Sequence, residues 1–200
     1  MAEKKPINCK QMKQIRAFLI ASLGEEQGSK LAGQADAKLA DILAATQGKS
    51  PNQMKTLTQT ILPRIALYQT LQMGGMTQAE TMILMRRYML DVVAAKKHAS
   101  TAKMECVPGF YRIYSSIFLK IMKTTDLQQS TQHCEKDSYD ITITKCLWHT
   151  ACVENGCEEL CRLFCDVDDV TYGGLRKIGF SRTQTLGYGG TCCDFHFYRK

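Results

Sequence analysis

The sulfur chemistry available to this protein is concentrated in its last third. Nine of its ten cysteines lie between Cys106 and Cys193, and only Cys9 lies elsewhere. A thiol is partly ionised near neutral pH, and its thiolate is a strong nucleophile and a good metal ligand. Carboxylates and an arginine lie among these cysteines. Residues 139–197 therefore offer nucleophilic attack, proton transfer and the binding of an anion.

These residues lie on elements that the hydrophobic pattern predicts after Ser138. Apolar and polar side chains alternate first, return to helical spacing, and then alternate twice more; alternation marks a strand with one buried face. A Gly-Gly pair between the last two alternating segments is typical of a tight hairpin turn. We expect strands at 139–144, 176–187 and 192–198, a helix at 150–165, an acidic turn at Asp166, Asp168 and Asp169, and a hairpin turn at Gly189–Gly190.

Before residue 125 the pattern is helical. Ser50 followed by Pro51 and Thr77 followed by Glu80 are typical helix starts. Pro63 is expected to kink or break the helix that contains it. Apolar residues at helical spacing predict helices at about 8–23, 25–46, 51–72, 77–92 and 109–122.

The predicted elements define an α+β fold, in which an N-terminal helical lobe is followed by a small antiparallel sheet with covering helices. The helical lobe covers residues 1–125, and the cysteine-rich α+β lobe covers residues 139–200. The polar stretch 124–138 is expected to connect them. A length of 200 residues suits one good-sized domain, so we expect the two lobes to pack into one compact domain.

Composition favours a globular cytoplasmic protein. Hydrophobic residues make up 44% of the chain and charged residues 22%, and no apolar run approaches the roughly 20 residues that span a bilayer. Lys4 and Lys5 precede an apolar stretch at Ala17–Leu23, but Glu25 and Glu26 follow it and no export cleavage site is evident. Without an export signal, we expect the thiols to be reduced.

The net charge of +7 comes from the first 130 residues. Their Lys and Arg side chains are scattered among Gln, Thr and Ala, without dense runs or interleaved aromatic rings. This pattern predicts a solvated helical surface rather than a nucleic-acid site. The basic excess can steer anionic small molecules toward a site. We expect a small-molecule substrate as the partner, with no nucleic acid and no membrane, and an oligomer is compatible with the sequence.

Five short segments of the last third form a recognisable set. They are Tyr139-Asp-Ile-Thr-Ile-Thr-Lys-Cys146, Gly156 with Glu159-Leu160, Phe164-Cys165-x-x-Asp168, Arg182-Thr-Gln-Thr-Leu186, and Gly189-Gly190-x-x-Cys193-Asp194-Phe195-x-Phe197. Together they resemble the L-2-amino-thiazoline-4-carboxylic acid hydrolase family, and the resemblance extends loosely back to about residue 50. It implies a hydrolase without a cofactor that opens the ring of 2-aminothiazoline-4-carboxylate to a carbamoyl-cysteine.

Such a ring opening needs a nucleophile at the amidine-like carbon, a proton donor for the leaving group and an anchor for the carboxylate. A thiolate, a carboxylate and an arginine suit these tasks, and all three occur at the matched positions. We expect Cys193 as the nucleophile with Cys146 and Cys165 as alternatives, Asp194 and Asp168 as amidinium-binding and acid–base groups, and Arg182, Gln184 and His196 as substrate-binding groups.

Strand alternation leaves the composition of the site open. Cys193 is expected to share a face with Phe195 and Phe197, whereas Cys192, Asp194 and His196 face the other way. A site on the second face would favour Cys192 over Cys193. Arg182 and Gln184 are expected on a mostly apolar strand face with Ile178, Phe180 and Leu186, where an arginine requires an anionic partner.

Each candidate also has a structural explanation. Cys157, Cys161 and Cys165 are four residues apart, which is typical of packing on one helical face, and we assign no role to Cys152, Cys157 or Cys161. Asp168 can cap a helix, and Arg182 can simply pair with a nearby aspartate.

Two other functions compete with a cofactor-free hydrolase. Cys146, Cys165 and Cys193, with a histidine, could hold zinc and activate water. Alternatively, helices followed by an α+β lobe with a Gly-Gly hairpin and a cysteine-bearing strand are similar to the vinyl-reductase type of small-molecule-binding domain. That similarity implies a sensor without catalysis.

Overall fold

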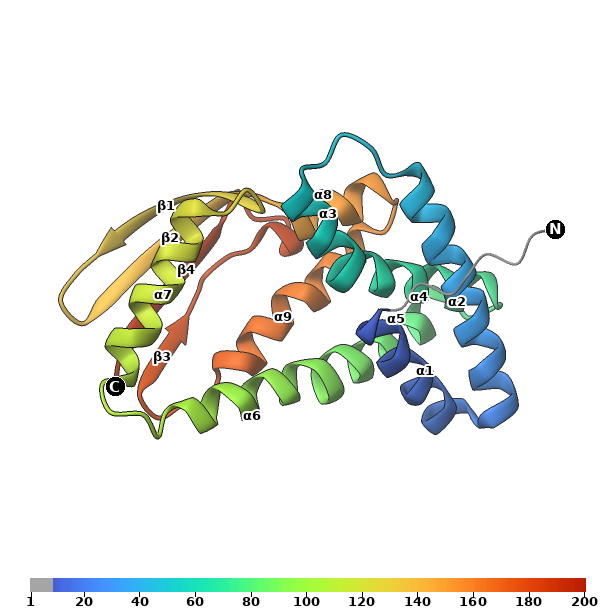
Figure 1. Cartoon of the computed structure of the whole chain (residues 1–200), viewed down its shortest axis with the longest axis horizontal. Helices are drawn as coiled ribbons and strands as arrows, with labels where there is room; N and C mark the ends of the chain where they lie inside the picture. The colour runs from blue at the N-terminus through green and yellow to red at the C-terminus, as the bar shows by residue number, and fades with distance from the viewer. Residues whose placement is uncertain (1–8) are drawn as a thin grey trace. The chain divides into compact units, whose positions relative to one another are not determined.

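The computed structural model describes residues 9–200 (Figure 1). The protein divides into two compact units, a first unit that ends at Tyr88 and a second unit, Met89–Lys200, which contains the whole sheet. The predicted division between residues 125 and 139 stays a prediction. Lys4, Lys5 and the predicted start of the first helix at residue 8 lie outside the described residues. Within residues 9–200, no helix is both long enough and apolar enough to cross a membrane.

The first unit is helical, as predicted. Its core lies between helices whose apolar stripes face one another, with Ile15, Leu19, Leu39 and Ile65 fully buried. Both predicted helix starts are capping boxes, at Ser50 and Thr77. The elements are α1 (Lys10–Leu23), α2 (Glu25–Ala45), α3 (Pro51–Thr56), the π-helical turn η1 (Leu57–Ile61), α4 (Leu62–Met73) and α5 (Gln78–Arg86).

The break expected at Pro63 is a change of helix type. Pro63 lies in the first turn of α4, directly after η1. Its ring excludes a regular α-helical turn because it would meet the carbonyl of Gln59, and a wider π turn relieves that clash. The Cys9 thiol lies against the Thr58 and Gln59 carbonyls, at 3.6 and 3.9 Å.

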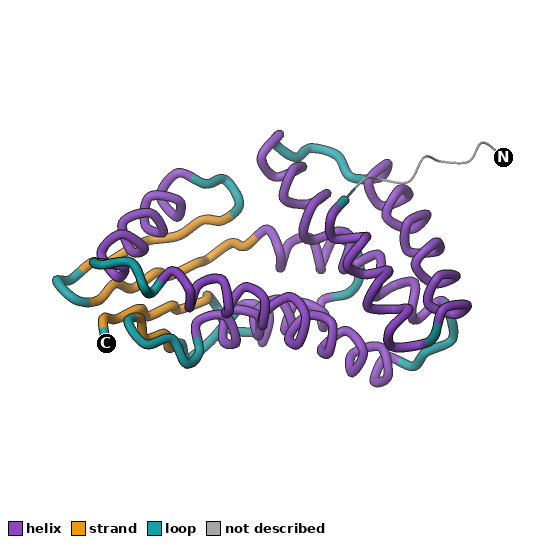
Figure 2. The backbone as a smooth tube through the Cα atoms, turned by 60° about the horizontal axis from the view of Figure 1, so that its bottom comes forward, coloured by secondary structure: helices purple, strands orange, loops and turns teal. Residues whose placement is uncertain are grey.

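The second unit is an antiparallel sheet with helical cover (Figure 2), so the predicted α+β fold is confirmed. The strand order is β1-β2-β4-β3. The strands are β1 (Gln128–Cys134), β2 (Ser138–Cys146), β3 (Ile178–Ser181) and β4 (Cys193–Arg199). The helical elements are the π-helical η2 (Arg87–Ala94), which continues from the first unit, α6 (Ala95–Met104), α7 (Phe110–Thr124), α8 (Leu147–Glu154), the 3-10 turn η3 (Glu158–Leu160), α9 (Cys161–Tyr172) and the 3-10 turn η4 (Leu186–Tyr188).

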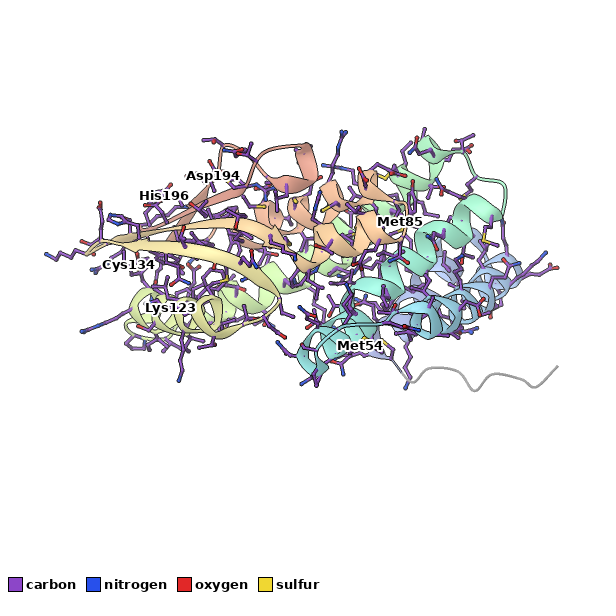
Figure 3. The ribbon with its side chains drawn as sticks, turned by 90° about the horizontal axis from the view of Figure 1, so that it is seen from above. Met54, Met85, Lys123, Cys134, Asp194 and His196 are labelled. Carbon is purple, nitrogen blue, oxygen red and sulfur yellow. The ribbon has the colours of Figure 1, made fainter. Side chains whose placement is uncertain are left out.

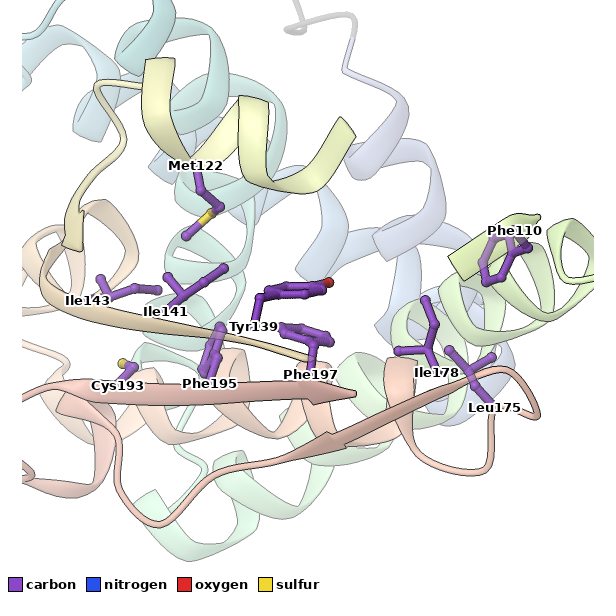
Figure 4. Close-up of a cluster of buried hydrophobic side chains, with 10 residues drawn as sticks. All are labelled: Phe110, Met122, Tyr139, Ile141, Ile143, Leu175, Ile178, Cys193, Phe195 and Phe197. Carbon is purple, nitrogen blue, oxygen red and sulfur yellow. The ribbon is translucent and has the colours of Figure 1, made fainter. Parts of the chain in front are cut away.

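The apolar face of the sheet forms the core of this unit (Figure 4). Tyr139 of β2 stacks on Phe197 of β4 with ring centroids 5.0 Å apart, and Tyr172 of α9 meets Phe197 edge-on. The predicted alternation of β4 is confirmed, since Cys193, Phe195 and Phe197 are buried, whereas Asp194 and His196 on the other face are half-buried.

Two sequence predictions about strands and helices were wrong. The stretch 124–138 contains β1 rather than a simple connection; β1 is an edge strand with partly exposed Gln, Ser, Thr and His side chains, so it carries no hydrophobic alternation. The helix predicted at 150–165 is two helices, because Gly156 interrupts it with a positive φ of 63°. α9 then continues through Asp166, Asp168 and Asp169, which are helical and not a turn.

The strand predicted at 176–187 ends at Ser181, and Gly189–Gly190 is not a two-residue hairpin. The cause is Asp194. Its carboxylate accepts hydrogen bonds from the backbone N–H groups of Thr183 (3.0 Å) and Gln184 (2.8 Å) and from the Thr183 hydroxyl. These N–H groups are therefore lost to the β-ladder, and the residues between Arg182 and Cys192 form a loop that includes η4. We call this segment the β3–β4 loop.

Truncating Phe197 tests the core. The Phe197→Ala variant is expected to lose about 3–5 kcal/mol of unfolding free energy, because the ring is fully buried among Tyr139, Tyr172 and Phe180. Urea denaturation followed by circular dichroism measures this loss. Val153→Ala is the control: Val153 is 43% exposed, and its truncation should change stability by no more than about 0.5 kcal/mol. Equal losses in both variants would contradict this description of the core.

Candidate functional site

One face of α9 gathers the chemistry of the second unit. Cys161, Cys165, Asp168 and Tyr172 are spaced by four, three and four residues, which places them on one helical stripe. Two sets of neighbours show what this stripe faces: Tyr172 meets Phe180 and Phe197 of the sheet, and Cys165 lies beside the β3–β4 loop at Thr185 and Gly187. α9 therefore holds a thiol and a carboxylate against the sheet and its loop.

Glycine at position 187 permits this close approach. A Cβ built on Gly187 would lie 2.8 Å from the Cys165 sulfur and 3.0 Å from the Cys161 carbonyl oxygen. Any larger residue would push the loop away from α9. The loop is also fastened by the Tyr188 hydroxyl, which donates to Asp166 at 2.7 Å, and by the backbone N–H of Tyr188, which donates to the Thr185 hydroxyl at 3.3 Å.

Arg182 lies directly after β3, and its side chain is only 9% exposed. One guanidinium nitrogen, Nη2, donates to Asp169 Oδ2 at 2.5 Å, and the guanidinium lies 6.0 Å from the centre of the Phe180 ring. The other terminal nitrogen, Nη1, is buried without a hydrogen-bond partner. Both expectations for Arg182 are thus compatible with the structure: it pairs with an aspartate and keeps a second donor for an anion.

Asp168 is the titratable group of the site. Burial raises the pKa of this carboxyl to about 6, although the positive charges of Lys97 and Arg182 oppose the rise. Two tyrosines on the same side also act on Asp168 electrostatically: the hydroxyl of Tyr114 on α7 donates to that of Tyr172 at 3.0 Å. A carboxyl with a pKa near 6 can exchange a proton close to neutral pH, as a general acid or base must.

Cys193 starts β4 with a thiol that is 5% exposed. Its sulfur accepts a hydrogen bond from the backbone N–H of Leu186 at 3.4 Å. Burial raises the pKa of the Cys193 thiol, while the Leu186 N–H and the positive charge of Arg182 lower it. A thiolate formed here would therefore be stabilised by one backbone dipole and one guanidinium.

The two alternative nucleophiles lie close to Cys193 but in less suitable surroundings. Burial raises the pKa of the Cys146 thiol to about 12, against the effect of the His149 and Trp148 backbone N–H groups. Cys165 is half-buried, and its hydrogen bond to the Cys161 thiol raises its pKa. Cys146 and Cys165 both interact electrostatically with Cys193, so the structure brings the three predicted thiols together.

The remaining predicted residues lie elsewhere. Asp194 and His196 project from the face of β4 opposite to Cys193, on the other side of the sheet from Lys123 of α7 (Figure 3). Asp194 holds the β3–β4 loop, as described above. His196 Nδ1 lies 2.6 Å from Asp140 Oδ1, across the strand pair. Gln184 Oε1 accepts from the Thr191 backbone N–H at 3.0 Å. Each of these side chains has a contact that stabilises the sheet or its loop.

Sequence reasoning missed Lys97, Tyr114 and Tyr172. Lys97 acts on Asp168 from α6, which is far away in sequence, and nothing in the Lys96–Lys97 pair signals this contact. Tyr172 follows Asp168 by four residues, and this helical spacing would have revealed it had the segment been assigned to a helix. Within residues 9–200, no three His, Cys, Asp or Glu side chains are arranged as ligands for a metal ion.

Comparisons with known proteins agree with the motifs. The sequence model of one family, described as L-2-amino-thiazoline-4-carboxylic acid hydrolase, matches residues 53–197. No curated protein matches the chain. Among solved structures, the crystal structure of the Fe(II) unliganded H-NOX protein from K. algicida is similar at 9% identity and a TM-score of 0.33, covering 95% of each chain. Similarity at that level assigns no function. The match over residues 53–197 shows that this chain belongs to the L-2-amino-thiazoline-4-carboxylic acid hydrolase family.

Proposed function

We propose that this protein hydrolyses a small cyclic amidine that carries a carboxylate, with 2-aminothiazoline-4-carboxylate as the model substrate and a carbamoyl-cysteine as the product. Membership of the family supports the ring-opening reaction. The observation that carries the proposal is the buried Arg182 guanidinium, whose Nη1 lacks a partner and which acts electrostatically on both Asp168 and Cys193.

Arg182 binds the substrate carboxylate in this proposal. A buried donor without a partner costs about 1–3 kcal/mol, and a carboxylate that accepts from Nη1 recovers this cost in a charge-assisted hydrogen bond. Asp169 keeps the guanidinium in place by occupying Nη2. The ionised form of Asp168 pairs with the cationic amidine at the other end of the ring. The opposite charges of the two groups thus match the two ends of a zwitterion.

Cys193 acts as the nucleophile. Its sulfur attacks the carbon between the ring sulfur and the two nitrogens, and the bond from this carbon to the ring sulfur breaks. The substrate sulfur leaves as a thiol, and the enzyme keeps a covalent thioether to the amidine carbon. Water then adds to that carbon, the bond to Cys193 breaks, and a carbamoyl group remains on the cysteine product.

Asp168 moves the protons. With a pKa of about 6, its carboxylate can take a proton as the Cys193 thiol attacks, deliver it to the leaving sulfur and later activate the water. The Tyr114–Tyr172 hydroxyl pair and Lys97 surround Asp168 and orient the polar end of the site.

Substitution of the three candidate groups tests the assignment. Cys193→Ala and Asp168→Asn should each lower kcat by about 10²–10⁴-fold, because each removes a group that acts on the reacting bonds. Arg182→Lys keeps the charge but not the planar pair of nitrogens, and it should lower kcat/KM by roughly 10–100-fold. Release of the product thiol into a thiol-reactive dye follows the reaction.

Cys146→Ala is the matched control for Cys193→Ala and should retain most of the turnover. Retention of full activity by Cys193→Ala, with loss in Cys165→Ala, would transfer the nucleophile to Cys165. Recovery of the thiazoline unchanged after prolonged incubation with the wild-type protein would favour the sensor function and reject the hydrolase.

The pH dependence tests Asp168 separately. Burial raises the pKa of Asp168, so its active carboxylate form is lost as the pH falls through about 6. The rate constant kcat/KM should therefore fall on the acid side with an apparent pKa near 6, measured under steady-state conditions in buffers of constant ionic strength. The residual activity of Asp168→Asn should lack this limb. An unchanged limb in that variant would exclude Asp168 as the titrating group.

A further inference from the structure

Four cysteines that the proposed hydrolysis does not need as nucleophiles lie in contact with one another. Cys157 and Cys161 each form a side-chain hydrogen bond with Cys152, and Cys161 forms another with Cys165. We call this set, in the spatial order Cys157, Cys152, Cys161 and Cys165, the thiol row. All four are free thiols; Cys165 is half-buried beside the candidate site, and the other three are buried.

The elements around the thiol row explain its order. Cys152 lies in the last turns of α8, Cys157 directly precedes η3, and Cys161 is the first residue of α9. The turn between α8 and η3 folds back so that the Cys157 thiol donates to the Cys152 carbonyl at 3.5 Å. The row therefore joins two helices that the sequence separates by a short turn.

Cys161 is the member of the row that best carries a negative charge. The thiols of Cys152 and Cys165 donate to it and lower its pKa, and the same hydrogen bond raises the pKa of Cys152. Its position in the first turn of the 12-residue helix α9 adds the positive end of the helix dipole. A thiolate at Cys161 thus faces a neutral thiol at Cys152.

Geometry selects the partner of Cys161. Side chains at positions i and i+4 of a helix have Cβ atoms about 5–6 Å apart, whereas a disulfide requires about 3.5–4.5 Å. A bond between Cys161 and Cys165 would therefore distort α9. Cys152 approaches Cys161 from a different helix, so the two sulfurs can close to bonding distance by small movements of their side chains.

We propose that Cys152 and Cys161 form a redox modification site, at which a peroxide converts the two thiols into an intramolecular disulfide between α8 and α9. The Cys161 thiolate attacks one peroxide oxygen, an S–O bond forms, the O–O bond breaks, and hydroxide leaves. The Cys152 sulfur then attacks the resulting sulfenic acid; the S–S bond forms, the S–O bond breaks, and water is released with the Cys152 proton. The two sulfurs together lose two electrons, which reduce the peroxide.

Mass spectrometry tests the site without reference to hydrolysis. The reduced full-length protein is treated with hydrogen peroxide, the remaining thiols are alkylated, and the protein is cut with a protease that cleaves after glutamate. Glu154, Glu158 and Glu159 separate Cys152, Cys157 and Cys161 onto three different fragments. We expect a linked pair that joins the fragment ending at Glu154 to the one beginning at Leu160, lighter by two hydrogens than the sum of the reduced fragments.

Single variants assign the bond to individual sulfurs. Cys152→Ala and Cys161→Ala should each abolish the linked pair, whereas Cys146→Ala and Cys165→Ala, which lie on the same two fragments, should retain it. Circular dichroism confirms that each variant is folded. A linked pair that survives in Cys152→Ala, a Cys161–Cys165 link, or complete alkylation of the wild-type protein after peroxide treatment would overturn the proposal. Loss of thiazoline hydrolysis in any variant bears on the proposed function alone.

Discussion

The candidate site depends on one interaction, the pairing of the Arg182 guanidinium with Asp169 away from bulk water. A buried guanidinium is costly unless its donors are occupied, and here Asp169 occupies only one side while Nη1 remains without a partner. The same positive charge acts on Asp168 and on the Cys193 thiol. Arg182 thus links an anion-binding donor, an acid–base group and a nucleophile, and its burial makes each of these interactions stronger than it would be in water.

The fold holds Arg182 in this position by two local arrangements. Asp194 collects the Thr183 and Gln184 N–H groups, which ends β3 immediately before Arg182 and turns the backbone into the β3–β4 loop. Gly187 then allows this loop to lie directly on α9, next to Cys165. Asp194 therefore has a clear structural task on the opposite face of the sheet, and any direct catalytic part for it stays a prediction. The cysteine clustering has a second consequence, since the tight approach of the loop, α8 and α9 also creates the thiol row.

Much of this architecture could be predicted from the sequence, and the failures have physical causes. The capping boxes at Ser50 and Thr77, the helical stripes and the alternation along β4 are local signals, and the structure confirms them. β1 was missed because an edge strand of polar residues has no apolar period. The extent of α9 was missed because its three aspartates suggest a turn, whereas the buried surroundings supplied by other elements favour a helix.

The candidate site was predictable only in part. The family motifs single out Asp168, Arg182 and Cys193, and the electrostatic effect of Arg182 on the other two groups places them near one another. Their roles in catalysis stay predictions. Partners such as Lys97 and Asp169 depend on tertiary contacts that no spacing encodes.

The charge state of Asp168 tests this account most directly, because it reports the burial of the site without any substrate. Carbon NMR of protein labelled at the aspartate carboxyl, with the Asp168 signal assigned by its absence in Asp168→Asn, follows the carboxyl through a pH titration. The account predicts a pKa of about 6 for Asp168. A pKa near 4, the ordinary value for a solvated aspartate, would show that water reaches this carboxyl and that the site beside Arg182 is not the desolvated one described above.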